Sequence, residues 1–178
     1  MPERMANGAL LARLDARDRA LFTRLSVFET ASRNARVFWT TITHMGGVVS
    51  SISLATFPFV TGGALVPEAR RALATLVISH VIVQFVKRTV GRPRPARVLG
   101  DVAIVVEPDR FSFPSGHAAA AMSVAIVYAI AFPAFASILI PLAMLVGMSR
   151  VCLGVHYPGD VLMGQIIAVL TAIPVVLS

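Results

Sequence analysis

A few polar side chains stand out in the apolar C-terminal part of this chain, and their types suit nucleophilic and acid–base chemistry. After residue 110, the only charged side chains are Arg150 and Asp160, and the only histidines are His117 and His156. A charge without a partner is costly in hydrocarbon, so the few charges that an apolar segment retains usually serve a function. All four residues lie at the ends of apolar runs, where a site could face water.

The segment over residues 149–160 could supply a nucleophile and the acid that orients it. His156 and Asp160 are four residues apart at the start of the last apolar run. A carboxylate that binds one imidazole nitrogen fixes the tautomer and leaves the other nitrogen free to attack. We therefore expect His156 to attack phosphorus and form a phosphohistidine that water later cleaves. A structural His–Asp pair would have the same spacing. Arg150 adds a fork that can bind phosphate.

The segment over residues 113–117 precedes another apolar run and could bind an anion. Ser115 is a good N-cap, and the first turn of a helix leaves backbone N–H groups without partners. Together with the helix dipole, these groups favour a phosphate. Gly116 lets a ligand approach the backbone closely, and His117 is placed to give a proton to a leaving oxygen. The alternative is a capped helix with an incidental histidine.

The segment over residues 87–95 is strongly basic. Lys87 is the only lysine of a chain that has fifteen arginines, which indicates a position for a compact point charge. Arg94 can grip a phosphate with two parallel hydrogen bonds. A basic loop that flanks a membrane is the alternative. With Arg150 and the helix N-terminus, these cations could hold the charge of a phosphoryl group, so this set requires no metal. We see no metal-ligand cluster or Walker-type loop, and we expect no cofactor.

The three segments together strongly resemble the type 2 phosphatidic acid phosphatase (PAP2) superfamily of membrane lipid phosphatases. The family signatures are a lysine separated by six residues from Arg-Pro, a Pro-Ser-Gly-His, and a Ser-Arg followed by a histidine and an aspartate. Here they are Lys87 with Arg94-Pro95, Pro114 to His117, and Ser149-Arg150 with His156 and Asp160. The resemblance covers residues 47–178 as one phosphatase domain, and residues 1–46 form an amphipathic, interfacial region in this interpretation.

The resemblance implies a metal-independent enzyme that acts on lipid phosphates or diphosphates, with His156 as nucleophile, Asp160 as its partner and His117 as general acid. Candidate substrates are phosphatidic acid, phosphatidylglycerol phosphate, a polyprenyl phosphate or diphosphate, and lipid A. A lipid phosphotransferase would use the same residues, with an acceptor hydroxyl in place of water. A haloperoxidase with the same anion cradle would be soluble, and this chain is not. If the polar residues served only in packing, the chain would instead be a non-catalytic membrane scaffold or a transporter.

Composition and periodicity describe the elements that must position these residues. Of 178 residues, 56% are hydrophobic and 14% charged, whereas a soluble domain has about 25% charged residues. We therefore predict an all-α integral membrane helical bundle. Five apolar stretches approach the length of about 20 residues that a spanning helix needs; they cover residues 47–66, 70–90, 115–133, 135–151 and 159–177. Many family members have six spans, so a sixth stays possible.

Five spans bring the proposed chemistry to one side of the membrane. The loop over residues 91–114 and the link over residues 150–158 are two crossings apart, so they lie on the same face. Basic residues concentrate on this side, which by the positive-inside rule would be cytoplasmic. Many bacterial relatives of similar motif act on the outer face, so the face stays open. We expect a bacterial inner-membrane protein, and nothing in the sequence indicates its oligomeric state.

The N-terminal region predicts an amphipathic helix over residues 9–29. Its apolar side chains follow helical spacing; they are Leu10, Leu11, Leu14, Leu21, Phe22, Leu25 and Phe28. Such a helix could lie on the membrane surface or pack on the protein itself. The first 36 residues lack the continuous apolar segment of a signal peptide. The net charge of +7 does not predict nucleic-acid binding, because no recognised motif accompanies it.

Overall fold

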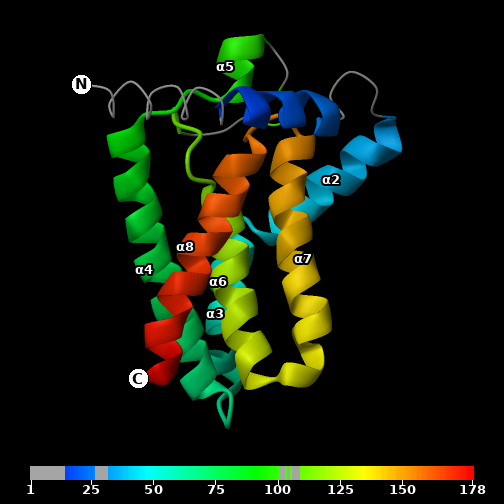
Figure 1. The fold of residues 1–178 in the computed structure, drawn as a ribbon. Coiled ribbons are helices and arrows are strands. Elements are labelled where there is room, and N and C mark those ends of the chain that lie inside the picture. The colour runs from blue at the N-terminus through cyan, green and yellow to red at the C-terminus, as the bar shows by residue number, and fades with distance from the viewer. Residues whose placement is uncertain (1–14, 27–31, 101–102, 104, 106–108) are drawn as a thin grey trace, which may run out of the picture.

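The computed structural model describes residues 15–26, 32–100, 103, 105 and 109–178, and this part of the chain is an α-helical bundle (Figure 1). A helix over residues 15–25 comes first. It is followed by α2 (Arg33–Met45), α3 (Val48–Thr61), α4 (Val66–Val90), α5 (Pro95–Leu99), α6 (Gly116–Ala131), α7 (Pro133–Cys152) and α8 (Pro158–Leu177). The described residues contain no strand, and Pro93 and Phe111 form an isolated antiparallel bridge.

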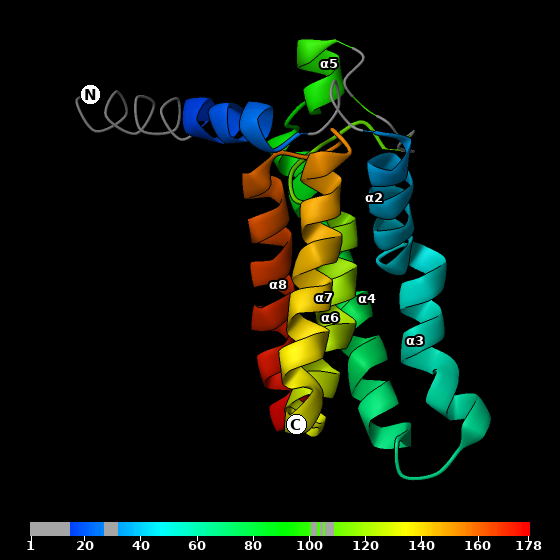
Figure 2. The same ribbon diagram turned by 90° about the vertical axis from the view of Figure 1, so that its right-hand side faces the viewer.

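Three helices of the described part, α4, α7 and α8, are long and apolar enough to cross a membrane. The apolar helices α3 and α6 are shorter, and α2 precedes α3 with a break at Gly46 and Gly47 (Figure 2). The predicted all-helical membrane bundle is confirmed at this level. α4 begins four residues before the predicted span, at Val66, because Pro67 and Glu68 suit the first turn of a helix.

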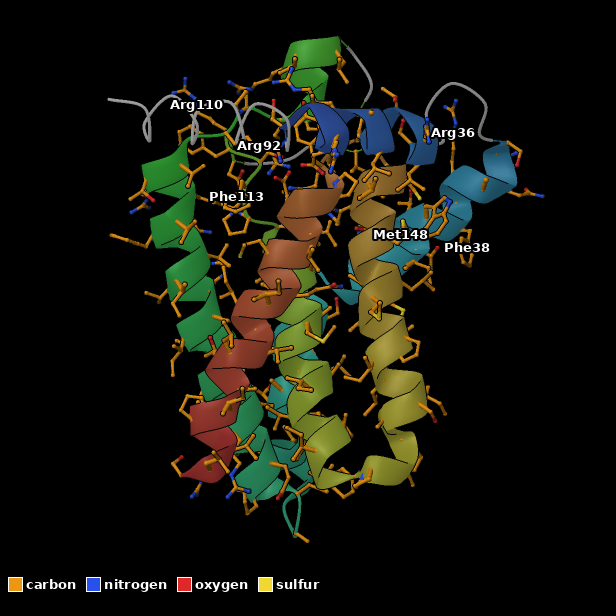
Figure 3. All side chains as sticks on the ribbon, viewed as in Figure 1. Arg36, Phe38, Arg92, Arg110, Phe113 and Met148 are labelled. Carbon is orange, nitrogen blue, oxygen red and sulfur yellow. The ribbon has the colours of Figure 1, made fainter. Side chains whose placement is uncertain are left out.

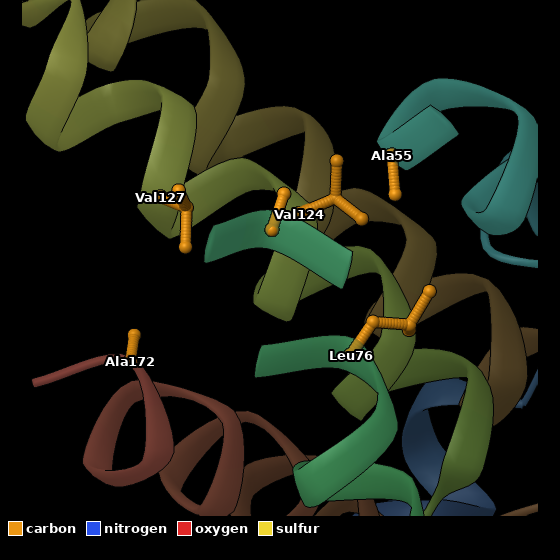
Figure 4. Packing of buried hydrophobic residues seen from close by; sticks show 6 residues of the cluster. Ala55, Leu76, Val124, Val127 and Ala172 are labelled. Atoms are coloured by element: carbon orange, nitrogen blue, oxygen red, sulfur yellow. The ribbon is translucent and has the colours of Figure 1, made fainter. Parts of the chain in front are cut away.

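Helix α6 contacts α3, α4, α7 and α8, and the core forms around it. Its side chains join those of neighbouring helices in a cluster of small and branched residues (Figure 4); its members are Ala55, Ala72, Leu76, Val124, Val127 and Ala172. Small residues let helices approach closely where lipid supplies no hydrophobic driving force. Ser79 of α4 and Ser123 of α6 add a buried hydrogen bond of 2.8 Å between their hydroxyls.

Large apolar side chains cover the outside of the bundle. Along α4, Val77, Val81 and Phe85 are each more than half exposed and repeat every four residues, so they form one stripe on the outer face. Such a stripe would cost solubility in water and suits contact with lipid tails. The bundle therefore has the surface of an integral membrane protein.

The helix over residues 15–25 lies across one end of the bundle, opposite the C-terminus (Figures 1 and 2). Phe22 is 1% exposed and makes an edge-on contact with Tyr157, whose ring centroid is 5.4 Å away. Leu21 and Leu25 remain exposed. The helix is thus packed on the protein through Phe22, with apolar side chains left on its outer side. Residues 9–14 and 27–29 of the predicted helix lie outside the described residues.

Candidate active site

The predicted site residues meet at the end of the bundle that the helix over residues 15–25 crosses. Figure 3 places Arg92 and Phe113 there. Two backbone hydrogen bonds join the loops: the Ser112 N–H donates to the carbonyl of Arg92 at 2.8 Å, and the Ser115 N–H donates to the carbonyl of Asp160 at 2.9 Å. The segments around residues 92, 112–115 and 160 therefore hold one another in place.

His156 lies between a carboxylate and a guanidinium. Its Nδ1 is 3.5 Å from Oδ2 of Asp160, and its Nε2 is 3.3 Å from Nη1 of Arg94. The ring is 1% exposed, and its backbone N–H donates to the carbonyl of Arg150 at 3.2 Å. With the Asp160 carboxylate on the Nδ1 side, the neutral ring carries its proton there and presents the Nε2 lone pair toward the cations.

The carboxylate of Asp160 is fully buried and held from several sides. Its Oδ2 accepts hydrogen bonds from the Ser112 hydroxyl and, at 2.8 Å, from the Tyr157 N–H. Its Oδ1 accepts from Nη1 of Arg92 at 2.7 Å. Asp160 is also in the first turn of α8, where the helix dipole favours a negative charge. This set of donors fixes the orientation of the group that faces His156.

Lys87 and Arg94 form a buried cationic pair around the carboxylate of Asp109. Lys87 Nζ lies 2.8 Å from Oδ2 of Asp109, and Arg94 Nη2 lies 2.6 Å from Oδ1. Arg94 also donates to the carbonyl of Val155 at 3.0 Å. The two cations are 3% and 5% exposed, so they keep a geometry fitted to one small anion with two oxygens.

Arg150 is 1% exposed and approaches the site from the last turn of α7. Its Nη1 donates to the hydroxyl of Thr43 at 2.6 Å, a contact that ties α2 to α7. Its positive charge acts on His156, and the charge of Arg94 acts on Arg150 in turn. A third cation therefore acts on the imidazole of His156 from the end of α7.

The N-terminus of α6 completes the site. Ser115 is the N-cap, and its hydroxyl accepts from the Ala118 N–H at 3.5 Å. Apart from its chain neighbours and the backbone of its own helix, a Cβ added at Gly116 would meet no atom within 4 Å, so the first turn faces open space. His117 is half-buried and within the electrostatic reach of Arg94 and Lys87. The eight residues singled out in the sequence are thus brought to one place.

Burial and neighbouring charges tune the groups outside the helices. Burial lowers the pKa of His156 from an ordinary 6.5 to about 3, although Asp160 opposes this effect. Burial raises the pKa of Asp109, but hydrogen bonds from Lys87 and Arg94 outweigh it and hold that pKa below the usual 3.8. At neutral pH the site therefore contains a neutral imidazole at His156 and an ionised carboxylate at Asp109.

Four contributors to the site were not predicted as site residues from the sequence; they are Thr43, Arg92, Asp109 and Ser112. Asp109 and Ser112 lie in a loop without periodicity, and their partners are 15 to 48 residues away. Arg92 stands inside the basic segment, so its charge was visible but its direction toward Asp160 was not. The described residues hold no group of three or more His, Cys, Asp or Glu side chains that could bind a metal ion.

The family model of the PAP2 superfamily matches residues 68–178, which is more than half of the chain. The chain belongs to the PAP2 superfamily. The matched part contains the three motifs and excludes α2, α3 and the helix over residues 15–25.

Two curated relatives of this PAP2 protein are lipid phosphatases by name. The chain is 38% identical over 110 residues to decaprenylphosphoryl-5-phosphoribose phosphatase of Mycolicibacterium smegmatis, covering 57% of this chain and 58% of the relative. It is 35% identical over 95 residues to lipid A 1-phosphatase of Rhizobium johnstonii, covering 51% of this chain and 39% of the relative. The chain therefore spans about half the length of these two proteins.

Two solved structures resemble the whole PAP2 bundle. LpxE of Aquifex aeolicus superposes with a TM-score of 0.78 at 27% identity and covers 89% of this chain and 94% of its own. The transmembrane PAP2-type phosphatidylglycerolphosphate phosphatase of Bacillus subtilis gives a TM-score of 0.72 at 25% identity, with 92% and 84% covered. The likeness thus extends beyond the part that the family model matches.

Proposed function

We propose that this PAP2 protein is a metal-independent lipid phosphatase that works through a phosphohistidine at His156. The observation that carries the proposal is the placement of the imidazole: Nδ1 faces Asp160, and Nε2 faces Arg94. A nucleophilic nitrogen directed at a cationic phosphate cradle is what attack on phosphorus requires. The names of the relatives, which include lipid A and prenyl-linked phosphatases, agree with it.

In the first step, Nε2 of His156 attacks phosphorus and the bond from phosphorus to the lipid oxygen breaks. His117 gives its proton to that leaving oxygen, so the lipid departs as an alcohol or, from a diphosphate, as a monophosphate. Asp160 stabilises the positive charge that develops on the ring by holding the Nδ1 proton.

In the second step, a water molecule gives a proton to His117 and attacks the phosphohistidine. The nitrogen–phosphorus bond breaks, and inorganic phosphate and neutral His156 are released. Throughout both steps, the equatorial oxygens of the phosphoryl group are held by Lys87, Arg94 and Arg150, together with N–H groups at the α6 N-terminus.

The same proposal places the chain in the bacterial inner membrane with five crossings. Helix α3 has 14 residues, and a helix of that length rises about 21 Å, less than the roughly 30 Å of a hydrocarbon core. Together with α2 it is long enough, so α2 and α3 form one crossing. The long apolar helices α4, α7 and α8 form three more, and the shorter apolar helix α6, which contacts all three of them, forms the fifth. The helix over residues 15–25 then lies at the interface, with Leu21 and Leu25 toward the lipid headgroups.

Phosphate release tests the function. The detergent-purified protein is incubated with EDTA and a panel of phosphatidic acid, phosphatidylglycerol phosphate, polyprenyl phosphate and diphosphate, and lipid A. We expect release from at least one lipid class, none from His156→Ala, and an acid-labile phosphoenzyme in single turnover. Arg88→Gln is the control, because Arg88 is exposed and outside the site. Full turnover by His156→Ala, or activity that EDTA removes, would overturn the proposal.

A further inference from the structure

Arg92 forms the centre of a charge cluster that reaches the catalytic pair. Its Nη1 lies 2.7 Å from Oδ1 of Asp160 and also 2.7 Å from Oδ2 of Asp18. Its Nη2 lies 2.7 Å from Oδ1 of Asp15, and its guanidinium stacks over the ring of Tyr157 at 4.1 Å from the centroid. One side chain of the 91–114 loop therefore connects Asp160 with two carboxylates of the helix over residues 15–25.

The same helix holds the catalytic loop at two further points. Oδ1 of Asp18 accepts a hydrogen bond from the Gly159 N–H at 2.7 Å. Phe22 is buried in a cluster with Tyr157 and Val161, which are the neighbours of His156 and Asp160 in the sequence. A polar and an apolar contact thus fix this helix on the segment that carries the nucleophile and its acid.

We propose that Arg92 is a positioning residue for the reaction and that the helix over residues 15–25 acts through it on Asp160, an inference that rests on the proposed function. Arg92 holds Oδ1 so that Oδ2 stays directed at the Nδ1 of His156. The helix limits how far Arg92 can move, because Asp15 engages its Nη2 and Asp18 engages the same Nη1 that bonds Asp160. The catalytic pair is then complete only when the N-terminal helix is docked.

The electrostatics explain why an arginine is needed here. Asp15, Asp18 and Asp160 place three negative charges around one guanidinium, and without it they would repel one another. Although burial has the opposite effect, these carboxylates raise the pKa of Arg92 above its ordinary value, so the side chain stays charged. The planar fork presents donors on separate nitrogens in fixed directions, whereas a lysine offers one compact point charge.

Arg92→Gln tests the positioning role. The glutamine loses the charge and the fork, and we expect kcat to fall about 10- to 100-fold while KM changes by less than about twofold, as for other residues that orient a catalytic group. Arg92→Lys restores a point charge and should recover part of the loss. A variant that merely loosened the fold would raise KM and lower thermal stability together. Arg88→Gln is the matched control and keeps the wild-type kcat.

Asp15→Asn tests the part played by the helix. Asp15 contacts Arg92 but not Asp160, and its side chain is 39% exposed, so the variant leaves the core intact. We expect a fall in kcat smaller than that of Arg92→Gln, and no further fall when the two substitutions are combined. Losses that multiply in the double variant, or a kcat unchanged by Asp15→Asn, would overturn the role of the helix.

Orthovanadate binding, measured by isothermal titration calorimetry, separates this inference from the proposed function. Vanadate mimics the phosphoryl group in transfer and needs an oriented His156 whether or not a lipid is cleaved. If the wild type binds vanadate but cleaves no lipid phosphate, the lipid phosphatase proposal fails, and weaker vanadate binding by Arg92→Gln still supports positioning. Equal affinity in the two proteins overturns the positioning role. A wild type that binds no vanadate overturns both.

Discussion

The hydroxyl of Ser112 donates a hydrogen bond to the same oxygen of Asp160, Oδ2, that faces Nδ1 of His156. Ser112 is fully buried, and its Oγ lies 3.5 Å from Nδ1 as well. The hydroxyl, the carboxylate and the imidazole therefore form one buried polar group, in which Ser112 is one of the donors that orient Asp160 toward the ring. Buried groups of this kind are sensitive to the loss of a single member.

Ser112→Ala should therefore lower kcat about tenfold, with little change in KM, because Asp160 loses a donor that orients it and the phosphate cradle is untouched. Steady-state phosphate release measures the effect. Ser79→Ala is the matched control: it also removes a buried hydroxyl, but one between α4 and α6, so it should lower thermal stability without changing kcat. A Ser112→Ala enzyme with wild-type kcat would show that the Ser112 hydroxyl is not needed to orient Asp160.

Thermal stability should depend on His156 at acidic pH. The pKa of His156 is lowered from 6.5 to about 3 by burial, so between these values the unfolded chain binds a proton that the folded chain does not. The free energy of unfolding then falls as pH drops from 6.5 toward 3. In His156→Gln this contribution is absent, and Tm should fall less between pH 7 and pH 4. Equal slopes in wild type and variant would contradict the depressed pKa.

Lys87 and Arg94 bind Asp109 through the same donors that would hold a phosphate. Asp109→Asn removes a competing negative charge from the cradle, so inorganic phosphate should inhibit the variant at severalfold lower concentration than the wild type. Product-inhibition kinetics measure this constant. Glu68→Gln, at the far end of α4, serves as the control. An unchanged or weaker inhibition would mean that Asp109 only aligns the two cations.

The residues proposed to act on phosphate could be singled out from the sequence because their motifs are short and local. His156 and Asp160 are four residues apart, and Ser115 and His117 open one helix. The contacts that hold these residues are long-range: Ser112 meets Asp160 from 48 positions away, across a loop without periodicity. Hydropathy could predict the helices because the apolarity of a span is also a local property of the sequence. The docking of one helix on another depends on distant residues and could not be predicted in this way.

The N-terminal region illustrates the same limit. Its amphipathic pattern predicted a helix, but the pattern alone left the membrane surface and the protein as equal partners. The structure assigns Phe22 to the protein and leaves Leu21 exposed, a division that depends on the shape of the bundle end. The basic segment was likewise interpreted as a phosphate site, and nothing in the sequence indicated that one of its arginines, Arg92, turns toward Asp160.

Thr43 connects α2, which lies outside the part matched by the family model, to Arg150. Thr43→Val keeps the shape and removes the acceptor, so Arg150 should bind phosphate less well. A hydrogen bond to a charged group contributes about 1.5–3 kcal/mol, which corresponds to a rise in KM of roughly tenfold or more. Thr41→Val on the same helix is the matched control, because its hydroxyl bonds only the exposed backbone of its own helix among the contacts described. Equal KM values in both variants would contradict the role of Thr43.

Alanine at Gly164 and at Gly116 should lower activity in both cases but lower thermal stability only at Gly164. A Cβ at Gly164 would lie 2.4 Å from the carbonyl oxygen of Ser115, so α8 can approach the N-terminus of α6 only because Gly164 has no side chain. Gly164→Ala should cost about 1–3 kcal/mol of stability through overpacking, and it should shift the turn that we propose binds phosphate. Its Tm and its activity should therefore fall together.

Gly116→Ala introduces a methyl group into the open space beside the first turn of α6, where no atom lies within 4 Å apart from the chain neighbours and the backbone of the same helix. The fold should accept it, and Tm should stay that of the wild type. Vanadate affinity and kcat/KM should nevertheless fall, because the methyl group occupies space next to the N–H groups proposed to bind phosphate. A Gly116→Ala enzyme with full activity would place the phosphate elsewhere, since a bound anion at this helix end leaves no room for a side chain.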